Sequence, residues 1–245
     1  MKNVKSYIII FITIAALTLS ACQFSVIRGS GHVITEKREV SGFDAVSLSG
    51  IGDVTLTQGE NESLEIEAED NIISHIVTEV KGSTLYIYED QTASRTSVQP
   101  TRPINFNLAI KNLKSFDLSG AGSIHTATLK ADSLSISISG AGNITLDKLE
   151  ANALTTTVSG TGNLDIAGKV AQQNSHMSGL GNYHTPDLQT QSSTIEISGA
   201  GNATVWAQNN LAAHISGAGS TFYYGRPQVT QSISGIGSIK SLGNK

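Results

Sequence analysis

Acidic residues and histidines are the side chains of this sequence that could hydrolyse a bond or hold a metal, and a repeat of about 20 residues decides which of them meet. A polysaccharide hydrolase needs two carboxyl groups flanking one glycosidic bond. Aligned on the repeat, Asp147 and Asp165 fall one repeat apart at different positions, whereas Asp117 and Glu196 share a position four repeats apart. No two carboxylates share a position of adjacent repeats, so we predict a protein without enzyme activity.

The histidines are spaced too widely to chelate a metal by themselves. His176 and His214 share a position two repeats apart, and His125 and His184 share another position three repeats apart. If each repeat advances by ~4.8 Å, the closer pair lies ~9–10 Å apart, whereas zinc ligands lie ~2 Å from one ion. We therefore expect surface histidines, no metal site and no cofactor.

Aromatic residues near the C-terminus form the best candidate binding surface. Trp206 and Tyr224 occupy the same position of adjacent repeats, with Phe222 nearby. Alternation from the inward Val205 and Tyr223 places both rings on the outside. Two rings ~5 Å apart on a rigid sheet would make an apolar platform able to stack on a glycan or to contact a surface protein. Packing against a terminal cap or a partner copy is the alternative.

The single cysteine, Cys22, follows a segment typical of a secretory signal. Lys2 and Lys5 precede an apolar run over residues 7–19, and small residues follow at 20–21. The run is shorter than the ~20 residues that a membrane-spanning helix needs. With one cysteine the chain can form no internal disulfide and no zinc site built on cysteines.

Residues 19–22, Leu-Ser-Ala-Cys, resemble the signal of bacterial lipoproteins. The resemblance implies that residues 1–21 are a cleaved signal peptide and that Cys22 carries acyl chains, with membrane lipid as its partner; an ordinary signal peptide is the alternative. Several acyl chains would anchor the protein firmly. By the same resemblance, Gln23 favours the outer membrane of a Gram-negative cell, because Asp at that position retains lipoproteins in the inner membrane. Residues 22–31 are expected to form a short tether.

A tetrad, Ser-Gly-x-Gly, recurs along the chain and organises its second half. From Ser119 onward the intervals are 20, 20, 19, 20, 18 and 18 residues. The residue before each serine is apolar and the one before that is polar, which predicts a strand with one buried face. A second short strand follows each tetrad. The eight serines are Ser49, Ser119, Ser139, Ser159, Ser178, Ser198, Ser216 and Ser234.

Short-strand repeats cannot bury an apolar face alone, so they must stack on one another. We predict an all-β fold, a right-handed parallel β-helix or β-solenoid with coils of about 18–20 residues. Glycine would permit unusual dihedral angles or close backbone approach at each corner. A phosphate-binding loop is the alternative, but a nucleotide site would need one such loop followed by a helix. The structural glycines are Gly120, Gly122, Gly140, Gly142, Gly160, Gly162, Gly179, Gly181, Gly199, Gly201, Gly217, Gly219, Gly235 and Gly237.

The position after the tetrad holds asparagine in four successive repeats. These residues are Asn143, Asn163, Asn182 and Asn202. Stacked asparagines can hydrogen-bond along the axis of a parallel stack, so we expect a structural ladder. A polar binding strip is the alternative.

The domain is expected to span residues 32–245, with an irregular first part over 32–115 and regular repeats over 116–245. Ser49 and Ser119 are 70 residues apart, which leaves room for three to four coils without the tetrad. Alternation predicts strands at residues 55–57, 64–67, 85–88, 104–110 and 113–118.

Three connecting segments of the first part have their own predictions. Residues 81–83 read as a turn, and residues 70–80 as a short helical turn with Asp70 as its N-cap before a strand. Residues 92–103 are polar and contain Pro100 and Pro103, which predicts an exposed loop.

The composition excludes two classes of protein. Only 15% of the residues are charged, and β-branched residues recur regularly, which excludes a charged disordered chain. The net charge of −4 becomes −6 once Lys2 and Lys5 are removed with the leader. Binding to nucleic acid depends on a surplus of Lys and Arg facing phosphates, so we expect no nucleic-acid partner.

Three motifs together resemble the bacterial family described as "putative auto-transporter adhesin, head GIN domain". They are VSGFDAV at residues 40–46, EAEDN at residues 67–71 and the repeated Gly-x-Gly-Asn-Ile pattern. The resemblance covers about residues 31–245. It implies a β-helical fold on secreted or lipid-anchored bacterial proteins, and it brings no catalytic residues.

We therefore predict a lipid-anchored, non-catalytic β-solenoid that binds or adheres through the side of a rigid stack. It would sit in the outer membrane as a lipoprotein, facing the periplasm or the cell surface. The alternatives are a polysaccharide-acting β-helix enzyme and a purely structural spacer of the envelope. An enzyme requires acids that converge on one cleft, a binding protein requires an exposed aromatic or polar patch, and a spacer requires neither.

Overall fold

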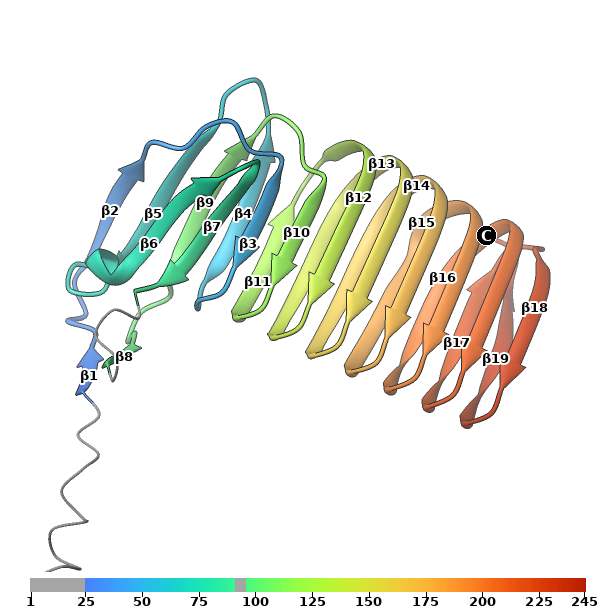
Figure 1. Ribbon diagram of the computed structural model, residues 1–245. Helices are drawn as coiled ribbons and strands as arrows, with labels where there is room; N and C mark the ends of the chain where they lie inside the picture. Colours follow the sequence, from blue (N-terminus) through green and yellow to red (C-terminus); the bar gives the residue numbers. More distant parts are fainter. Residues whose placement is uncertain (1–24, 91–95) are drawn as a thin grey trace, which may run out of the picture.

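A computed structural model describes residues 25–90 and 96–245, which form an elongated stack of strands (Figure 1). Cys22 and the signal segment lie outside the described residues. The described part is nearly all β, with one 3-10 turn. None of its helical segments has the length and apolarity to span a membrane.

The second half is a parallel β-solenoid, as the repeat predicted. Each strand pairs in parallel with the equivalent strand one repeat away, so that Ile138 lies opposite Val158 and Asn143 opposite Asn163. Its strands are β10 (Ser115–Leu118), β11 (Ala121–Thr126), β12 (Leu129–Ile138), β13 (Ala141–Val158), β14 (Thr161–Met177), β15 (Leu180–Ile197), β16 (Ala200–Ile215), β17 (Ala218–Tyr224), β18 (Gln228–Ile233) and β19 (Ile236–Gly243).

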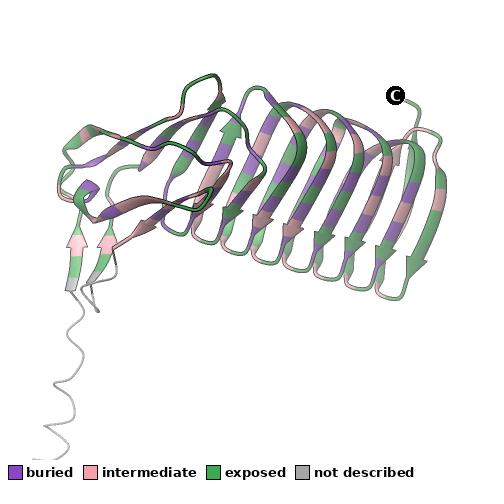
Figure 2. Cartoon of the chain, turned by 45° about the horizontal axis from the view of Figure 1, so that its top comes forward, coloured by how far each residue is buried: buried purple, intermediate pink, exposed green. Residues whose placement is uncertain are grey.

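Alternation decides which side chains fill the interior (Figure 2). The apolar residues before the tetrad serines are buried, with Ile138 fully enclosed and Val158 and Ile197 1% exposed. Ile233, in the last coil, is 43% exposed because no further coil covers it. The interior also holds polar side chains, among them Gln173, which the alternation of apolar residues did not predict.

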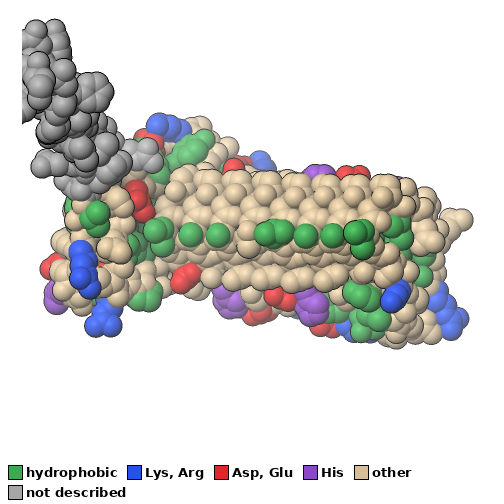
Figure 3. Space-filling model, turned by 90° about the horizontal axis from the view of Figure 1, so that it is seen from below, with side chains coloured by type: hydrophobic (Ala, Val, Ile, Leu, Met, Phe, Trp, Pro, Cys, Tyr) green, Lys and Arg blue, Asp and Glu red, His purple; other side chains and the backbone are tan. Residues whose placement is uncertain are grey.

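The tetrads stack into one straight edge of the solenoid, visible from below in Figure 3. Close approach of the backbone requires their glycines, and Gly122 and Gly181 also have positive φ angles of 159° and 152°. A Cβ added to Gly140 would collide with the carbonyl oxygen of Gly120, and one added to Gly160 would collide with that of Gly140. Each corner therefore rests directly on the one below it.

The asparagine ladder forms beside this edge. The side-chain amide of Asn163 donates to Oδ1 of Asn143 at 3.0 Å, and that of Asn182 donates to Oδ1 of Asn163 at 3.1 Å. The ladder then continues through backbone donors, since the amide N–H groups of Asn202 and Ser220 bond to the asparagine one repeat before. These bonds run along the axis and tie successive coils together.

The first half departs from the prediction of three to four further coils. Strands β3 and β4 continue the solenoid, and β7 and β9 pair with them in parallel. The remaining pairings, β2 with β5, β5 with β9 and β6 with β7, are antiparallel. The strands are β2 (Val33–Arg38), β3 (Ala45–Leu48), β4 (Asp53–Gln58), β5 (Ser63–Glu69), β6 (Ile76–Lys81), β7 (Thr84–Glu89) and β9 (Asn105–Ile110). They cover the open end of the stack, where exposed strand edges would otherwise invite pairing with other chains.

Two connecting segments differ from expectation. The expected tether contains β1 (Ser25–Arg28), and the expected loop contains β8 (Thr96–Gln99), with which β1 pairs in parallel. Neither segment alternates clearly, so only their mutual pairing defines them as strands. The turn at Gly82 is confirmed as the link between β6 and β7.

The predicted helical turn exists as a 3-10 turn over Ile73–His75, directly before β6, but Asp70 is not its cap. The N-cap is Ile72, whose side chain makes no capping hydrogen bond. Asp70 instead accepts a hydrogen bond from the hydroxyl of Ser30, which joins the turn region to the segment after β1.

Candidate binding surfaces

The structure brings the predicted aromatic residues together at the far end of the solenoid. Trp206 of β16 and Tyr224 of β17 are direct partners in register, and both are partly exposed on the outer face. Phe222 lies two residues before Tyr224 on the same face of β17 and is also partly exposed. We call Trp206, Tyr224 and Phe222 the aromatic strip.

A lysine that does not belong to the repeat occupies the outer side of the strip. The ammonium of Lys245 lies 5.6 Å from the centre of the Trp206 ring and 5.3 Å from that of Tyr224, within range of a cation–π interaction. It also forms an ion pair with Asp187 and donates to the carbonyl of Pro186 at 2.6 Å. The aromatic strip therefore has one cation beside it, and Asp187 holds that cation in place. Alignment of the repeats could not reveal this lysine, because Lys245 follows the last repeat.

A groove that sequence reasoning missed runs along the edge opposite the glycine corners. It has two adjoining parts, of about 340 and about 460 Å³, which share Lys130 and Ala131. Its floor includes the in-register small residues Ala131 and Ala151 followed by Val170. Small residues recurring at the repeat interval, about half a coil from the tetrads, were the sequence feature that could have indicated it.

Two carboxylates that line the groove are paired with lysines. Lys130 lies 2.9 Å from Glu150, and Lys114 lies 2.5 Å from Asp44. The hydrogen bond and charge of Lys130 lower the pKa of Glu150, and those of Lys114 lower the pKa of Asp44 despite its partial burial. Both carboxyl groups stay ionised at neutral pH, so neither can serve as the general acid that glycoside hydrolysis needs.

The histidines pair with carboxylates on the outside of the solenoid. Nδ1 of His184 lies 2.8 Å from Asp165, and Nδ1 of His176 lies 3.2 Å from Glu196. Both histidines are about half exposed, and Glu196 separates His176 from His214 in register. Among the described residues, no three His, Cys, Asp or Glu side chains gather in an arrangement that could hold a metal.

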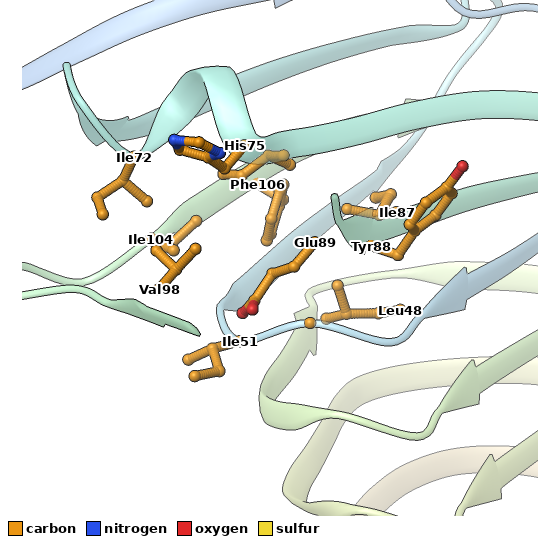
Figure 4. A pocket seen from close by; sticks show the side chains of 12 residues that line it. Leu48, Ile51, Ile72, His75, Ile87, Tyr88, Glu89, Val98, Ile104 and Phe106 are labelled. Carbon is orange, nitrogen blue, oxygen red and sulfur yellow. The ribbon is translucent and has the colours of Figure 1, made fainter. Parts of the chain in front are cut away.

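One enclosed pocket lies under the strands that cover the open end (Figure 4). Glu89 points its carboxylate between Ile51 and Val98, and burial raises the pKa of that carboxyl group. The lining is otherwise mostly apolar, and the space holds about one water molecule. It has no second carboxylate and no room for a sugar, so it cannot act as a hydrolase site.

Residues 42–227 match the family model described as "Putative auto-transporter adhesin, head GIN domain". The chain belongs to this family. Membership of this adhesin family supports a binding module at the cell envelope or surface. The matched region contains the tetrad repeats through Gly219. A comparison with curated protein sequences finds no match.

Solved structures agree with the fold. A putative adhesin from Bacteroides fragilis is 26% identical and covers 88% of this chain and all of its own, with a TM-score of 0.83. A putative lipid binding protein and a putative adhesin, both from Parabacteroides distasonis, each cover 89% of this chain and all of their own with TM-scores of 0.69. At 23% and 21% identity, these two show the shared fold alone.

Proposed function

We propose that this protein is a non-catalytic adhesin-like module, anchored to the outer membrane through acylated Cys22, that binds a glycan or a surface protein with its aromatic strip. The adhesin family and the Bacteroides fragilis neighbour support the binding role. The Leu-Ser-Ala-Cys segment at residues 19–22 supports the anchor, and Gln23 supports the outer membrane.

The observation that carries the proposal is the in-register pairing of Trp206 with Tyr224 on the outside of a rigid sheet. Flat aromatic side chains provide contact area at a low cost in conformational entropy, and the sheet fixes their spacing. Lys245 adds a donor beside the rings, so that a hydroxyl-rich ligand can stack and hydrogen-bond at once. The ion-paired carboxylates of the groove disfavour the hydrolase alternative.

The binding role is tested by attachment of the soluble chain, residues 23–245, to glycans and to bacterial surfaces. Trp206→Ala and Tyr224→Ala should each weaken attachment by about tenfold, the scale of one lost aromatic contact. Tyr86→Ala, which truncates a partly exposed ring at the opposite end, is the matched control and should leave attachment unchanged. Attachment that survives both strip variants would reject the strip as the binding surface.

The anchor is tested separately by intact mass and detergent partitioning of the full chain. The wild-type protein should carry acyl chains on Cys22 and enter the detergent phase, whereas Cys22→Ala should stay in the aqueous phase or retain its leader. An unmodified Cys22 in the wild-type protein would contradict lipid anchoring without touching the binding role.

A further inference from the structure

The third residue of each tetrad forms a straight apolar row along the glycine edge (Figure 3). Consecutive members pair directly in register, so the row advances one strand spacing per coil. Three members are large and exposed, at 46% for Ile51, 56% for Leu180 and 82% for Ile236. We call this set the apolar row: Ile51, Ala121, Ala141, Thr161, Leu180, Ala200, Ala218 and Ile236.

The fold does not require large apolar side chains in this row. The same position accepts Thr161 and four alanines. None of the eight members is buried in the apolar interior. Exposed apolar side chains aligned on one edge are typical of a contact surface rather than of packing.

The row also lies on the side of this acidic protein that has the fewest charged residues. In all eight tetrads and the residue after each, the only charged side chain is Asp53, and it accepts a hydrogen bond from the backbone of Ser123. The charged pairs lie elsewhere, in the groove on the opposite edge and on the outward faces of the strands. An acidic protein held near an anionic bilayer is repelled least when its uncharged side faces the lipid.

The chain enters the fold on the same side as this row. Strand β1 and its partner β8 extend from the domain toward the side of the glycine corners, in both views of the ribbon (Figures 1 and 2). Cys22 precedes the first residue of β1 by three positions, a span of at most about 10 Å. An acyl group on Cys22 would therefore hold this side of the molecule close to the bilayer.

We propose that the apolar row rests on the lipid surface, so that the anchored solenoid lies along the bilayer with its glycine corners against the lipid. This orientation depends on the proposed acylation of Cys22. The row inserts its leucine and isoleucine side chains at the boundary of the headgroups, and the acyl chains keep it there. The groove then faces away from the membrane, and the aromatic strip faces sideways.

Site-specific fluorescence on the acylated full chain in phosphatidylcholine vesicles tests this orientation. Leu180→Cys takes a polarity-sensitive label in the row, since acylation occupies the sulfur of Cys22. Asn209→Cys, an exposed position about half a coil away, is the matched control. A nitroxide on the lipid acyl chains should quench the label at 180 at least ~3-fold more than the label at 209, because interfacial side chains lie ~5–10 Å into the bilayer.

Three other results would contradict this orientation. Equal quenching at 180 and 209 in vesicle-bound protein would overturn the orientation while leaving the anchor intact. A shielded label at 180 without lipid quenching, in a protein that forms dimers, would show that a second copy covers the row. Labelling of Cys22 itself in the wild-type chain would overturn the anchor and the orientation that depends on it.

Discussion

At the scale of single residues, buried Glu69 links segments that are far apart in the sequence. Its carboxylate accepts hydrogen bonds from the backbone of Gly31 at 2.6 Å, and from the backbone and hydroxyl of Thr101 at 2.8 and 2.5 Å. Burial opposes ionisation, but these bonds, with one from the backbone of Arg102, outweigh it and lower the pKa to about 2. Glu69 thereby holds the chain after β1 against the chain after β8.

This lowered pKa predicts an acid-sensitive first half. Because the folded pKa lies below the ordinary value of 4.5, the stabilisation is complete above about pH 5 and is lost as the pH falls toward 2. Thermal melting should show Glu69→Gln less stable than wild type at pH 7, with the difference shrinking toward pH 2. Glu65→Gln, on the same strand, is the control and should show no such trend. A difference that is constant with pH would contradict the proposed role of ionised Glu69.

Lys245 gives a second prediction at this scale. Trp206 is the only tryptophan, so its fluorescence reports the strip directly. Lys245→Ala should make the indole more accessible to acrylamide and should change the free energy of unfolding by no more than about 1 kcal/mol, as expected for a surface cation–π contact. Lys240→Ala, in the neighbouring strand opposite Phe222, is the control. Unchanged quenching of Trp206 in Lys245→Ala would show that the lysine does not shield the ring.

At the scale of strands, the sequence predicted the pairing of the strands in the repeats, but not the pairing of the strands in the irregular first half. The register of β12 to β17 follows from the tetrad spacing, because a slip by one residue would move every apolar side chain to the outside. The antiparallel strands β2, β5 and β6 carry no repeat. Alternation predicted a strand at residues 64–67, within β5, but it did not predict β2, whose partner β5 is distant in sequence. Strand β6 pairs with β7, which follows it directly across the turn at Gly82. Lys245 and the groove residues reach their sites only through the stacking of coils.

The interior of the coils offers a prediction about an unpaired amide. Gln173 is 1% exposed, and neither of its amide atoms has a hydrogen-bonding partner among the described residues. It lies in register with Leu154, so an apolar side chain of similar size fits the stack. Gln173→Leu should raise the free energy of unfolding by about 1–3 kcal/mol in urea melts, whereas Gln172→Leu, one residue away and exposed, should not. Destabilisation by Gln173→Leu would indicate that the amide is satisfied in solution.

At the scale of the whole molecule, the structure is a rod with three chemically different sides. One edge is flat and carries an apolar row with a single charged side chain, Asp53, beside it. The opposite edge is a groove that contains Lys–carboxylate pairs, and a side near the far end carries the aromatic strip. Mutual support between coils makes such a stack rigid, which suits a protein that holds a binding surface in a fixed orientation. A partly exposed aromatic pair in register on such a stack is the arrangement that the proposed binding role requires.

The central claim, binding without catalysis, is tested most directly by recovering the bound ligand. Soluble protein of residues 23–245 is applied to a glycan array, and the mass of each captured oligosaccharide is measured after prolonged incubation. We predict retention of at least one class of glycan with unchanged mass, and loss of that retention in Trp206→Ala. Shortened oligosaccharides released by the wild-type protein would contradict this prediction and would establish the hydrolase instead.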